Sequence, residues 1–471
     1  MTKPHSFHPT ILRAYDIRGV YQENLFEKDA YYIGLSFGTI VKKSQGKKVV
    51  LGYDGRLSSP SLAKEVEAGL LSSGVDVINI GLGPTPMLYF AAHHLKCDAG
   101  IMVTGSHNPK NYNGFKLTLN NKSFYGDDIQ KLGQLSESGL FSSGTGHSYQ
   151  SNVENAYIQR LLQEDLKNQE RPLNIVWDAG NGATGNIVKA LIEKLPGQHI
   201  VINSHIDGTF PNHHPDPTIP ENLEQLKTLV LEKSFDLGIG FDGDGDRIGL
   251  ITKAGKFVPG DHLLLILALN LLHEIPKSKI VADVKMSQSF YDTVRQKGGK
   301  PIMWCSGHAL VRTKMFLEKA PLAGEMSGHI FFGDRYYGFD DAIYAALRVI
   351  RTLNMEGQTF DDLMLNIPAT YSTPEIRFQC PEDKKFTVVE KIKKLLLENK
   401  YKGHIFDLDG VRFTSTNGWW LLRASNTQDV LVVRCEANTK ENLVKLIDEV
   451  SLILKTIGIS PPPELNESIK N

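Results

Sequence analysis

A local pattern that recurs three times along the chain constrains its fold most. A β-branched run ends in Asp, a turn rich in Gly or Ser follows, and a helical stretch comes next; the runs cover residues 49–54, 173–178 and 279–283. In the first copy, Ser59 is predicted to cap the helix and Pro60 to occupy its first position. Strands that alternate with helices form parallel, doubly wound sheets. The chain is therefore predicted to contain several related α/β domains.

A second repeat includes the residues directly after a strand. Residues 98–106 read DAGIMVTGS and residues 236–244 read DLGIGFDGD, so that Ser106 aligns with Asp244. A weaker third copy is LAGE at 322–325. Ligands of open α/β sheets bind beyond the carboxyl ends of the strands. We therefore expect the repeated domains to place reactive residues at equivalent strand ends.

The last hundred residues have another pattern. A strand, a basic helix at 386–399, further strands and a helix at 440–454 predict an α+β domain. The fold class expected is α/β, with three related α/β domains whose mixed sheets are mostly parallel, plus this C-terminal α+β domain. The expected boundaries are 1–150, 151–256, 257–367 and 368–471.

Charge and composition exclude several classes of function. The 471 residues hold 52 Lys plus Arg and 53 Asp plus Glu, so the chain has no bulk charge with which to bind nucleic acid or an anionic membrane. No apolar run approaches the roughly 20 residues of a spanning helix, and no signal peptide is visible. The four cysteines lack a C-x-x-C spacing, which indicates a reducing compartment; a cytoplasmic protein is expected.

The sharpest chemical motif is DGDGDR, which contains Asp242, Asp244, Asp246 and Arg247. Alternate residues of an extended segment share a face, and the glycines let the backbone bend so that the carboxylates converge. Two carboxylates about 4 Å apart repel by about 4 kcal/mol at an effective dielectric of 20, which a hard divalent cation relieves. An EF-hand is excluded because Arg247 and Lys253 occupy its required Gly and Glu positions. The alternative is a solvated acidic turn.

A second motif, TGSHNPKNYNGFK, comes directly after an apolar strand. It places Ser106 beside His107, with Lys110 and Lys116 close in sequence. A serine hydroxyl reacts when a base takes its proton, or when it carries a phosphoryl group that a metal and cations stabilise. Alone, the Ser-His pair is more typical of a capped loop. The aspartates at the matching strand end favour the reactive interpretation.

Two further polar loops complete the candidate site. GEMSGH at 324–329 brings a carboxylate, a hydroxyl and an imidazole together and suits sugar hydroxyls, although an ordinary turn has the same composition. RASNT at 423–427 offers a guanidinium, hydroxyls and an amide between two apolar strands, which suits a phosphate; the alternative is a polar hairpin tip.

Two motifs are interpreted as structural. GNGATG at 180–185, with Asp207 further along the chain, fits a dinucleotide-binding fingerprint, but a dehydrogenase would leave Ser106 and the aspartates unexplained. His213, His214 and Asp216 resemble metal ligands, but the prolines among them indicate a rigid interdomain loop.

Together these motifs resemble the α-D-phosphohexomutases, most closely the phosphomannomutase/phosphoglucomutase branch. TGSHNP, DGDGDR, GEMSGH and RASNT occur in the family's order, and RAYDIRG at 13–19 is similar to its N-terminal signature. The resemblance implies four domains around one central cleft. It implies reversible phosphoryl transfer between the 1- and 6-positions of hexose phosphates, mannose or glucose, through a phosphoserine and a hexose 1,6-bisphosphate intermediate.

The resemblance also assigns roles. Ser106 would carry the phosphoryl group, and one Mg²⁺ per chain would bind Asp242, Asp244, Asp246 and the phosphoserine. Arg247 and Lys116 would stabilise the transferring group, while the proton acceptor could be His107, Lys116 or His329. The non-reacting phosphate and the sugar would be bound by Tyr15, Arg18, Lys285, His308, Glu325, Ser327, Arg423, Ser425, Asn426 and Thr427.

The same motifs are compatible with other functions. A glucosamine-phosphate mutase, or a mutase for glucose phosphate alone, would share these motifs, and a non-catalytic module could bind sugar phosphate or a metal without turnover. Partners are expected to be small hexose phosphates, with no nucleic acid and no membrane. A monomer is expected.

Overall fold

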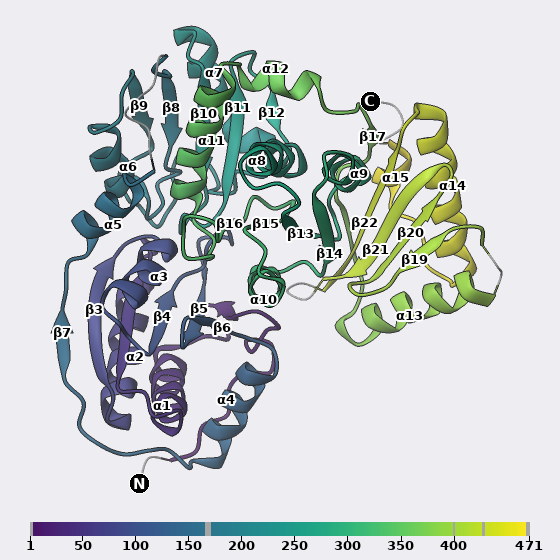
Figure 1. Cartoon of the computed structure of the whole chain (residues 1–471). Coiled ribbons are helices and arrows are strands. Elements are labelled where there is room, and N and C mark those ends of the chain that lie inside the picture. Colours follow the sequence, from purple (N-terminus) through teal and green to yellow (C-terminus); the bar gives the residue numbers. More distant parts are fainter. Residues whose placement is uncertain (1–2, 165–170, 399–400, 426–428, 468–471) are drawn as a thin grey trace.

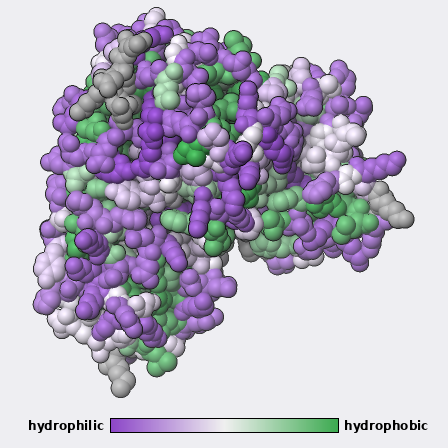
Figure 2. Space-filling model, viewed as in Figure 1, coloured by the Kyte–Doolittle hydropathy of each residue, from purple (hydrophilic) through white to green (hydrophobic). Residues whose placement is uncertain are grey.

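The structure, a computed structural model, describes residues 3–164, 171–398, 401–425 and 429–467. Its strands form four sheets, one for each of four consecutive domains, and the C-terminal domain stands to one side (Figure 1). The surface is indented between the N-terminal and C-terminal domains (Figure 2). Among the helices in the described ranges, none is both long and apolar enough to cross a membrane.

The first domain contains a sheet with strand order β1-β5-β4-β2-β3-β7, and β6 pairs with β5. Its strands are β1 (Ile17–Val20), β2 (Lys48–Tyr53), β3 (Asp76–Leu82), β4 (Ala99–Val103), β5 (Tyr112–Leu119), β6 (Lys122–Phe124) and β7 (Ser148–Gln150). Its helices are α1 (Glu27–Lys43), α2 (Ser59–Ser73), α3 (Thr85–His94) and α4 (Asp127–Ser138).

Helix α2 begins one residue earlier than predicted. Its first residue is Ser59, so Pro60 is the second. The prediction that Ser59 caps the helix is wrong, because its hydroxyl donates to Oδ1 of Asp54 at 2.5 Å. The Ser59 hydroxyl, which was predicted to cap the helix, therefore helps to hold the end of β2.

The second and third domains have smaller sheets, ordered β12-β11-β10-β8-β9 and β14-β13-β15-β16. The second contains α5 (Glu154–Leu161), β8 (Ile175–Asp178), α6 (Gly185–Ile192), β9 (His199–Ile202), the 3₁₀ helix η1 (Pro220–Leu223), α7 (Glu224–Lys233), β10 (Leu237–Phe241), β11 (Ile248–Thr252) and β12 (Phe257–Val258). The third contains α8 (Gly260–Glu274), β13 (Lys279–Asp283), α9 (Gln288–Gln296), β14 (Lys300–Trp304), α10 (His308–Glu318), β15 (Leu322–Gly324), β16 (Ile330–Phe332), α11 (Ala342–Glu356) and α12 (Phe360–Leu365).

One arrangement is shared by the three sheets. In each, the strand of the second repeat (β4, β10 or β15) is parallel to one neighbour (β2, β8 or β13) and antiparallel to the other (β5, β11 or β16). The loops after β4, β10 and β15 therefore leave equivalent sheet edges. The predicted relationship among three α/β domains with mixed sheets is confirmed.

The C-terminal domain is α+β, as predicted. Its antiparallel sheet has the order β17-β22-β21-β20-β19, with β18 beside β22. The elements are β17 (Tyr371–Ser372), β18 (Ile376–Gln379), α13 (Glu382–Glu398), β19 (His404–Phe406), β20 (Val411–Ser415), β21 (Gly418–Ala424), β22 (Val430–Ala437), α14 (Lys440–Thr456) and α15 (Pro463–Glu467). Helix α13 begins four residues before the position predicted from its basic residues.

Two arginines join the C-terminal domain to the third domain. Arg412 donates to the carbonyls of Val284 and Met286 at 2.6 and 2.7 Å, and its guanidinium lies 3.6 Å from the ring centroid of Trp419. Arg434 donates to the carbonyl of Lys285 at 2.6 Å. These bonds hold the loop after β13, so the C-terminal domain helps to position the loop that carries Lys285.

Candidate active site

The loop after β4 presents Ser106 in a sparsely populated conformation. Its φ is 48°, in the left-handed region that a residue with a side chain adopts at a cost. Asp54, directly after β2, holds this loop, because its Oδ2 accepts from the Thr104 hydroxyl at 2.8 Å and from the Gly105 amide at 3.1 Å. The Ser106 amide in turn donates to Oγ1 of Thr104 at 2.9 Å. The Ser106 hydroxyl is therefore fixed at the carboxyl end of β4.

A buried arginine holds the same loop from behind. Over distances of 2.6–2.9 Å, the two Nη atoms of Arg56 donate to the carbonyls of Ser106, Asn108, Pro109 and Tyr112. Phe210 of the second domain lies over the guanidinium, 5.2 Å from its carbon to the ring centroid. A planar guanidinium offers a fixed fan of donors, so one side chain fixes the whole turn.

Arg56→Lys is expected to lower kcat by about 10- to 100-fold. The substitution should loosen the turn that carries Ser106, and a small displacement of a reacting group has effects of this size. A single ammonium cannot replace four donors in one plane, and each buried carbonyl left unpaired costs about 1–3 kcal/mol. Steady-state kinetics and the thermal midpoint measure both effects. Arg295→Lys on α9, an exposed position, is the control. An unchanged kcat for Arg56→Lys would show that the loop does not depend on the guanidinium.

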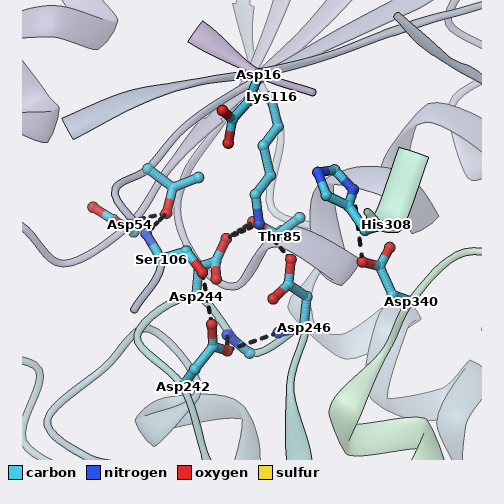
Figure 3. Close-up of polar contacts among 12 residues, drawn as sticks. Asp16, Asp54, Thr85, Ser106, Lys116, Asp242, Asp244, Asp246, His308 and Asp340 are labelled. Carbon is cyan, nitrogen blue, oxygen red and sulfur yellow. Dashed lines mark hydrogen bonds and ion pairs between the residues drawn. The ribbon is translucent and has the colours of Figure 1, made fainter. Parts of the chain in front are cut away.

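The aspartates of DGDGDR lie around Ser106 at the end of β10 (Figure 3). The Ser106 hydroxyl donates to Oδ2 of Asp242 at 2.7 Å, and Oδ1 of Asp242 accepts three backbone amides of its own loop at 2.9–3.2 Å. Lys116, on β5, donates to Asp244 at 2.6 Å and also to Asp246. The two motifs that the sequence placed at equivalent strand ends therefore meet in one place.

The carboxylate cluster fits a hard divalent cation. Burial, and then the charges of Asp246 and Asp244, raise the pKa of Asp242 well above its usual value. Oδ1 of Asp244 and Oδ1 of Asp246 are buried without a hydrogen-bond partner. One oxygen from each of the three carboxylates lies within 4.8 Å of the others. Convergent carboxylate oxygens with free acceptor capacity are ligands typical of Mg²⁺, Mn²⁺ or Ca²⁺.

Two basic groups near Ser106 have opposite protonation tendencies. Burial works to lower the pKa of Lys116, but Asp244 and Asp246 outweigh it and raise the pKa well above its usual value. Burial, and then the charge of Arg247, lower the pKa of His107 well below its usual value. Lys116 is therefore an ammonium ion, whereas His107, whose Nδ1 lies 3.2 Å from Oγ of Ser106, is a neutral imidazole.

His329 brings a second imidazole to the aspartate cluster. Its Nε2 accepts from Nε of Arg247 at 3.1 Å, and its Nδ1 lies 2.9 Å from Oδ2 of Asp340 and 3.7 Å from Oδ1 of Asp246. Burial lowers the pKa of His329, but the charge of Asp246 and the contact with Asp340 outweigh it, so the pKa lies above its usual value. His329 is thus the most basic imidazole of the site.

The sugar-loop candidates lie on the third domain. Oε2 of Glu325 accepts from the Gly307 amide at 3.1 Å and from the Ser327 hydroxyl at 3.5 Å. His308 comes after Gly307 at the start of α10, and its ring stacks on His329 with centroids 5.6 Å apart. Burial lowers the pKa of His308 to about 4, so this ring is neutral near pH 7.

Interdomain contacts bring Lys285 and Arg423 to these loops. Nζ of Lys285 lies 3.3 Å from Oε2 of Glu375 in the C-terminal domain. Nε and Nη2 of Arg423 each lie 3.1 Å from Oδ1 of Asp409, whose Oδ2 accepts from the Ser306 amide at 2.9 Å. One carboxylate therefore links the predicted phosphate-binding arginine to the loop that precedes His308.

The N-terminal candidates also reach the site. The Tyr15 hydroxyl donates to the carbonyl of Ser306 at 2.8 Å, and Arg18 donates to the side chain of Asn108 in the Ser106 loop. In the hairpin between β21 and β22, the Ser425 amide donates to the carbonyl of Val430 at 3.0 Å. Two predicted residues, Asn426 and Thr427, lie outside the described residues.

The glycines of GNGATG serve packing. A Cβ on Gly182 would lie 2.8 Å from the carbonyl oxygen of Gly243, and one on Gly185 would lie 2.1 Å from that of Ser204. The loop thus needs glycine to approach the aspartate loop. Nε2 of His213 lies 2.9 Å from the carboxylate of Asp178, which ends β8 of the same domain.

Several residues of the site were not predicted from the sequence, among them Asp54, Arg56, Asp340, Glu375 and Asp409. The signal for Asp54 was present, since it ends the first strand–Asp copy. Its counterpart Asp283 likewise accepts from the next loop, from the Met326 amide at 3.2 Å. Arg56 and Asp409 lie in short turns whose composition is typical of exposed loops.

The comparisons with known proteins agree with this geometry. The family profiles of phosphoglucomutase/phosphomannomutase match residues 9–140 (α/β/α domain I), 155–255 (domain II), 259–371 (domain III) and 375–453 (C-terminal domain). A phosphomannomutase/phosphoglucomutase of Pseudomonas syringae pv. tomato is 42% identical over 95% of this chain and 96% of its own. A phosphoglucomutase of Neisseria gonorrhoeae is 36% identical over 95% and 97%. The crystal structure of a phosphoglucomutase/phosphomannomutase family protein from Burkholderia thailandensis superposes with a TM-score of 0.89 at 39% identity, covering 96% of this chain and 98% of that one.

A serine hydroxyl beside a buried carboxylate cluster, on three related α/β domains and an α+β domain, defines an enzyme of phosphoryl transfer. With relatives that match along nearly its whole length, the chain belongs to the α-D-phosphohexomutase family, and it is a phosphohexomutase.

Proposed function

We propose that this phosphohexomutase interconverts the 1- and 6-phosphates of glucose and mannose, with a phosphoryl group carried on Ser106 and a hexose 1,6-bisphosphate as the intermediate. The observation that carries the proposal is the 2.7 Å contact between the Ser106 hydroxyl and Asp242, inside a cluster that fits a divalent cation. Relatives with 40–42% identity are named phosphomannomutase/phosphoglucomutase, which supports both sugars.

Mg²⁺ would be held by Asp242, Asp244, Asp246 and an oxygen of the phosphorylated Ser106. When bound, it would neutralise negative charge on the phosphoryl oxygens. Lys116 supplies a fixed positive charge at the same place, because its ammonium already contacts two of the aspartates.

The proton of the attacking sugar hydroxyl goes to His329. Lys116 is unsuited to accept it because its neighbours keep it protonated, and His107 is unsuited because its pKa is depressed. In the first transfer the sugar oxygen bonds to phosphorus, the bond from phosphorus to Oγ of Ser106 breaks, and the imidazole of His329 gains the proton. In the second transfer the same events occur in reverse from the other end of the bisphosphate.

The remaining candidates orient the substrate. Arg423, Ser425, Asn426 and Thr427 would bind the phosphate that does not react, so that binding energy aligns the reacting end. Glu325 and Ser327 would contact sugar hydroxyls that glucose and mannose share. The residues proposed to line the rest of the cleft are Tyr15, Arg18, Lys285 and His308.

Intact-protein mass tests the function. In the presence of Mg²⁺ and a hexose 1,6-bisphosphate, the dephosphorylated enzyme should gain one phosphoryl group, and excess hexose monophosphate should remove it. Chelation of the metal should stop both changes. A mass that never changes, with the substrate still isomerised, would overturn the phosphoserine route.

The sugar preference is measured by turnover of three 1-phosphates. We expect kcat/KM for glucose 1-phosphate and mannose 1-phosphate to agree within about tenfold. The two sugars differ only in the configuration of the C2 hydroxyl, and a hydroxyl that the proposed site does not bind has a small effect on kcat/KM. Glucosamine 1-phosphate should be turned over at least about tenfold less efficiently, since its charged amine replaces that hydroxyl. A preference for glucosamine 1-phosphate would instead support the alternative mutase.

A further inference from the structure

The loop that carries the aspartates is held from the first domain as well as from its own. Thr85, the first residue of α3, is fully buried where the first domain meets this loop. Its backbone amide donates to the carbonyl of Asp244 at 2.8 Å, and its hydroxyl donates to Oδ2 of the same residue at 2.5 Å. One threonine therefore holds both the backbone and the side chain of Asp244.

The two carboxylate oxygens of Asp244 differ in their contacts. Oδ2 accepts twice, from the Thr85 hydroxyl and from Nζ of Lys116 at 2.6 Å. Oδ1 is buried and has no hydrogen-bond partner among the described residues. Figure 3 shows the side chains of Thr85 and Lys116 directed toward Asp244. The carboxylate thus keeps one oxygen whose capacity to accept is unused.

The two donors to Oδ2 do not constrain the carboxylate equally. Lys116 also donates to Oδ2 of Asp246, and an ammonium on a flexible four-carbon stem acts as a point charge with rotatable donors. A threonine side chain is short and β-branched, so its rotation about χ1 is restricted. The backbone of Thr85 is itself bonded to the aspartate loop. The Thr85 hydroxyl is therefore the donor that fixes the rotation of the Asp244 carboxylate.

We propose that Thr85 is a positioning residue for the divalent cation: its hydroxyl occupies Oδ2 of Asp244 and leaves Oδ1 as the oxygen that binds the ion. This inference rests on the proposed function, in which Asp244 is a metal ligand. Hydrogen bonds to a metal ligand fix its orientation, and their loss typically changes metal affinity or activity by about 10- to 100-fold. Neither the sequence motifs nor the comparisons assign a role to Thr85.

Thr85→Val removes the hydroxyl and little else. Valine has nearly the same shape, and the amide of residue 85 can still donate to the carbonyl of Asp244, so the loop should stay attached to α3. Oδ2 would keep only the mobile Lys116 donor. We expect the Kd for Mn²⁺, which prefers the same oxygen ligands as Mg²⁺, to rise by about 10- to 100-fold. Electron paramagnetic resonance of free Mn²⁺ measures this Kd on the full-length, dephosphorylated enzyme.

Two further variants separate the hydroxyl from packing. Thr85→Ser keeps the donor and should bind Mn²⁺ within about threefold of wild type. Thr352→Val removes the hydroxyl of another buried threonine, which donates to the carbonyl of Arg348 at 2.9 Å in α11, and should leave the Kd unchanged. Circular dichroism checks that each variant is folded. A wild-type Kd for Thr85→Val would overturn the proposal, and so would an equal rise in Kd for Thr85→Ser or Thr352→Val.

A mutant cycle separates the proposal from the function on which it rests. If Thr85 acts through Asp244, Thr85→Val should raise the Kd for Mn²⁺ little further in an Asp244→Asn background. Independent effects of the two substitutions would overturn the positioning role and leave the metal site standing. Wild-type affinity for Mn²⁺ in Asp244→Asn alone would instead show that Asp244 is not a ligand, which would overturn the proposed metal site and the role of Thr85 with it.

Discussion

Ser106→Ala should lose at least about 10⁴-fold in kcat, because removing a nucleophile that acts in concert with its neighbours abolishes the pathway rather than weakening one contact. The methyl group cannot form the bond to phosphorus, and no other hydroxyl is held at that position in the described residues. The turn itself should survive, since its bonds to Asp54, Thr104 and Arg56 use backbone atoms of residues 104–106 or the Thr104 side chain.

Two measurements distinguish loss of chemistry from loss of fold. The intact mass of Ser106→Ala should remain unchanged with hexose 1,6-bisphosphate and Mg²⁺, and its affinity for the bisphosphate should stay within about tenfold of wild type, because binding energy resides elsewhere in the cleft. Ser72→Ala on α2, where the hydroxyl contacts the carbonyl of Ala68 and the hydroxyl of Tyr31, is the control. Turnover by Ser106→Ala near the wild-type rate would refute the phosphoserine.

The framework of the site could be predicted because it depends on local patterns. The alignment of Ser106 with Asp244 indicated that β4 and β10 are equivalent strands, and both strands have the same kind of neighbours in their sheets. DGDGDR converges because its glycines permit the turn, with a φ of 76° at Gly245. Hydrophobic periodicity and turn-forming residues act over a few positions, so both can be recognised from the sequence alone.

The parts that could not be predicted depend on contacts between distant segments. Asp409 joins Arg423 to Ser306 across two domains, and Asp340 faces His329 only because the chain returns beside β16. Such pairs have no fixed spacing. Arg56 is a related case: an arginine in a Gly-Arg turn is usually solvated, and only the fold of residues 105–112 around it shows that it is buried. Sequence alone therefore identified the reacting groups more readily than the residues that hold them.

Asp242→Asn should raise the concentration of Mg²⁺ needed for half-maximal activity by at least about tenfold and lower kcat at saturating metal by about 10²- to 10³-fold. The asparagine keeps the shape of the aspartate but removes one of three negative charges that a hard cation prefers. It also places an NH₂ group in one of two positions. At the position of Oδ2 the Ser106 hydroxyl would have to accept instead of donate, and at the position of Oδ1 the contacts with the three backbone amides would become donor against donor.

Asp178→Asn separates this effect from the burial of a carboxylate as such. Asp178 is 1% exposed and ends the strand next to β10, but it contacts His213 and the turn at Gly180 rather than the cluster. The Asp178→Asn substitution should lower the free energy of unfolding and leave unchanged the concentration of Mg²⁺ needed for half-maximal activity. Asp242→Asn should change the metal requirement even where the fold is intact, because Asp244 and Asp246 alone must then compensate the charge of the cation while Lys116 competes for the same oxygens. If the metal dependence of Asp242→Asn matched that of wild type, the cation would have to bind elsewhere, and the 2.7 Å contact with Ser106 would lose its catalytic meaning.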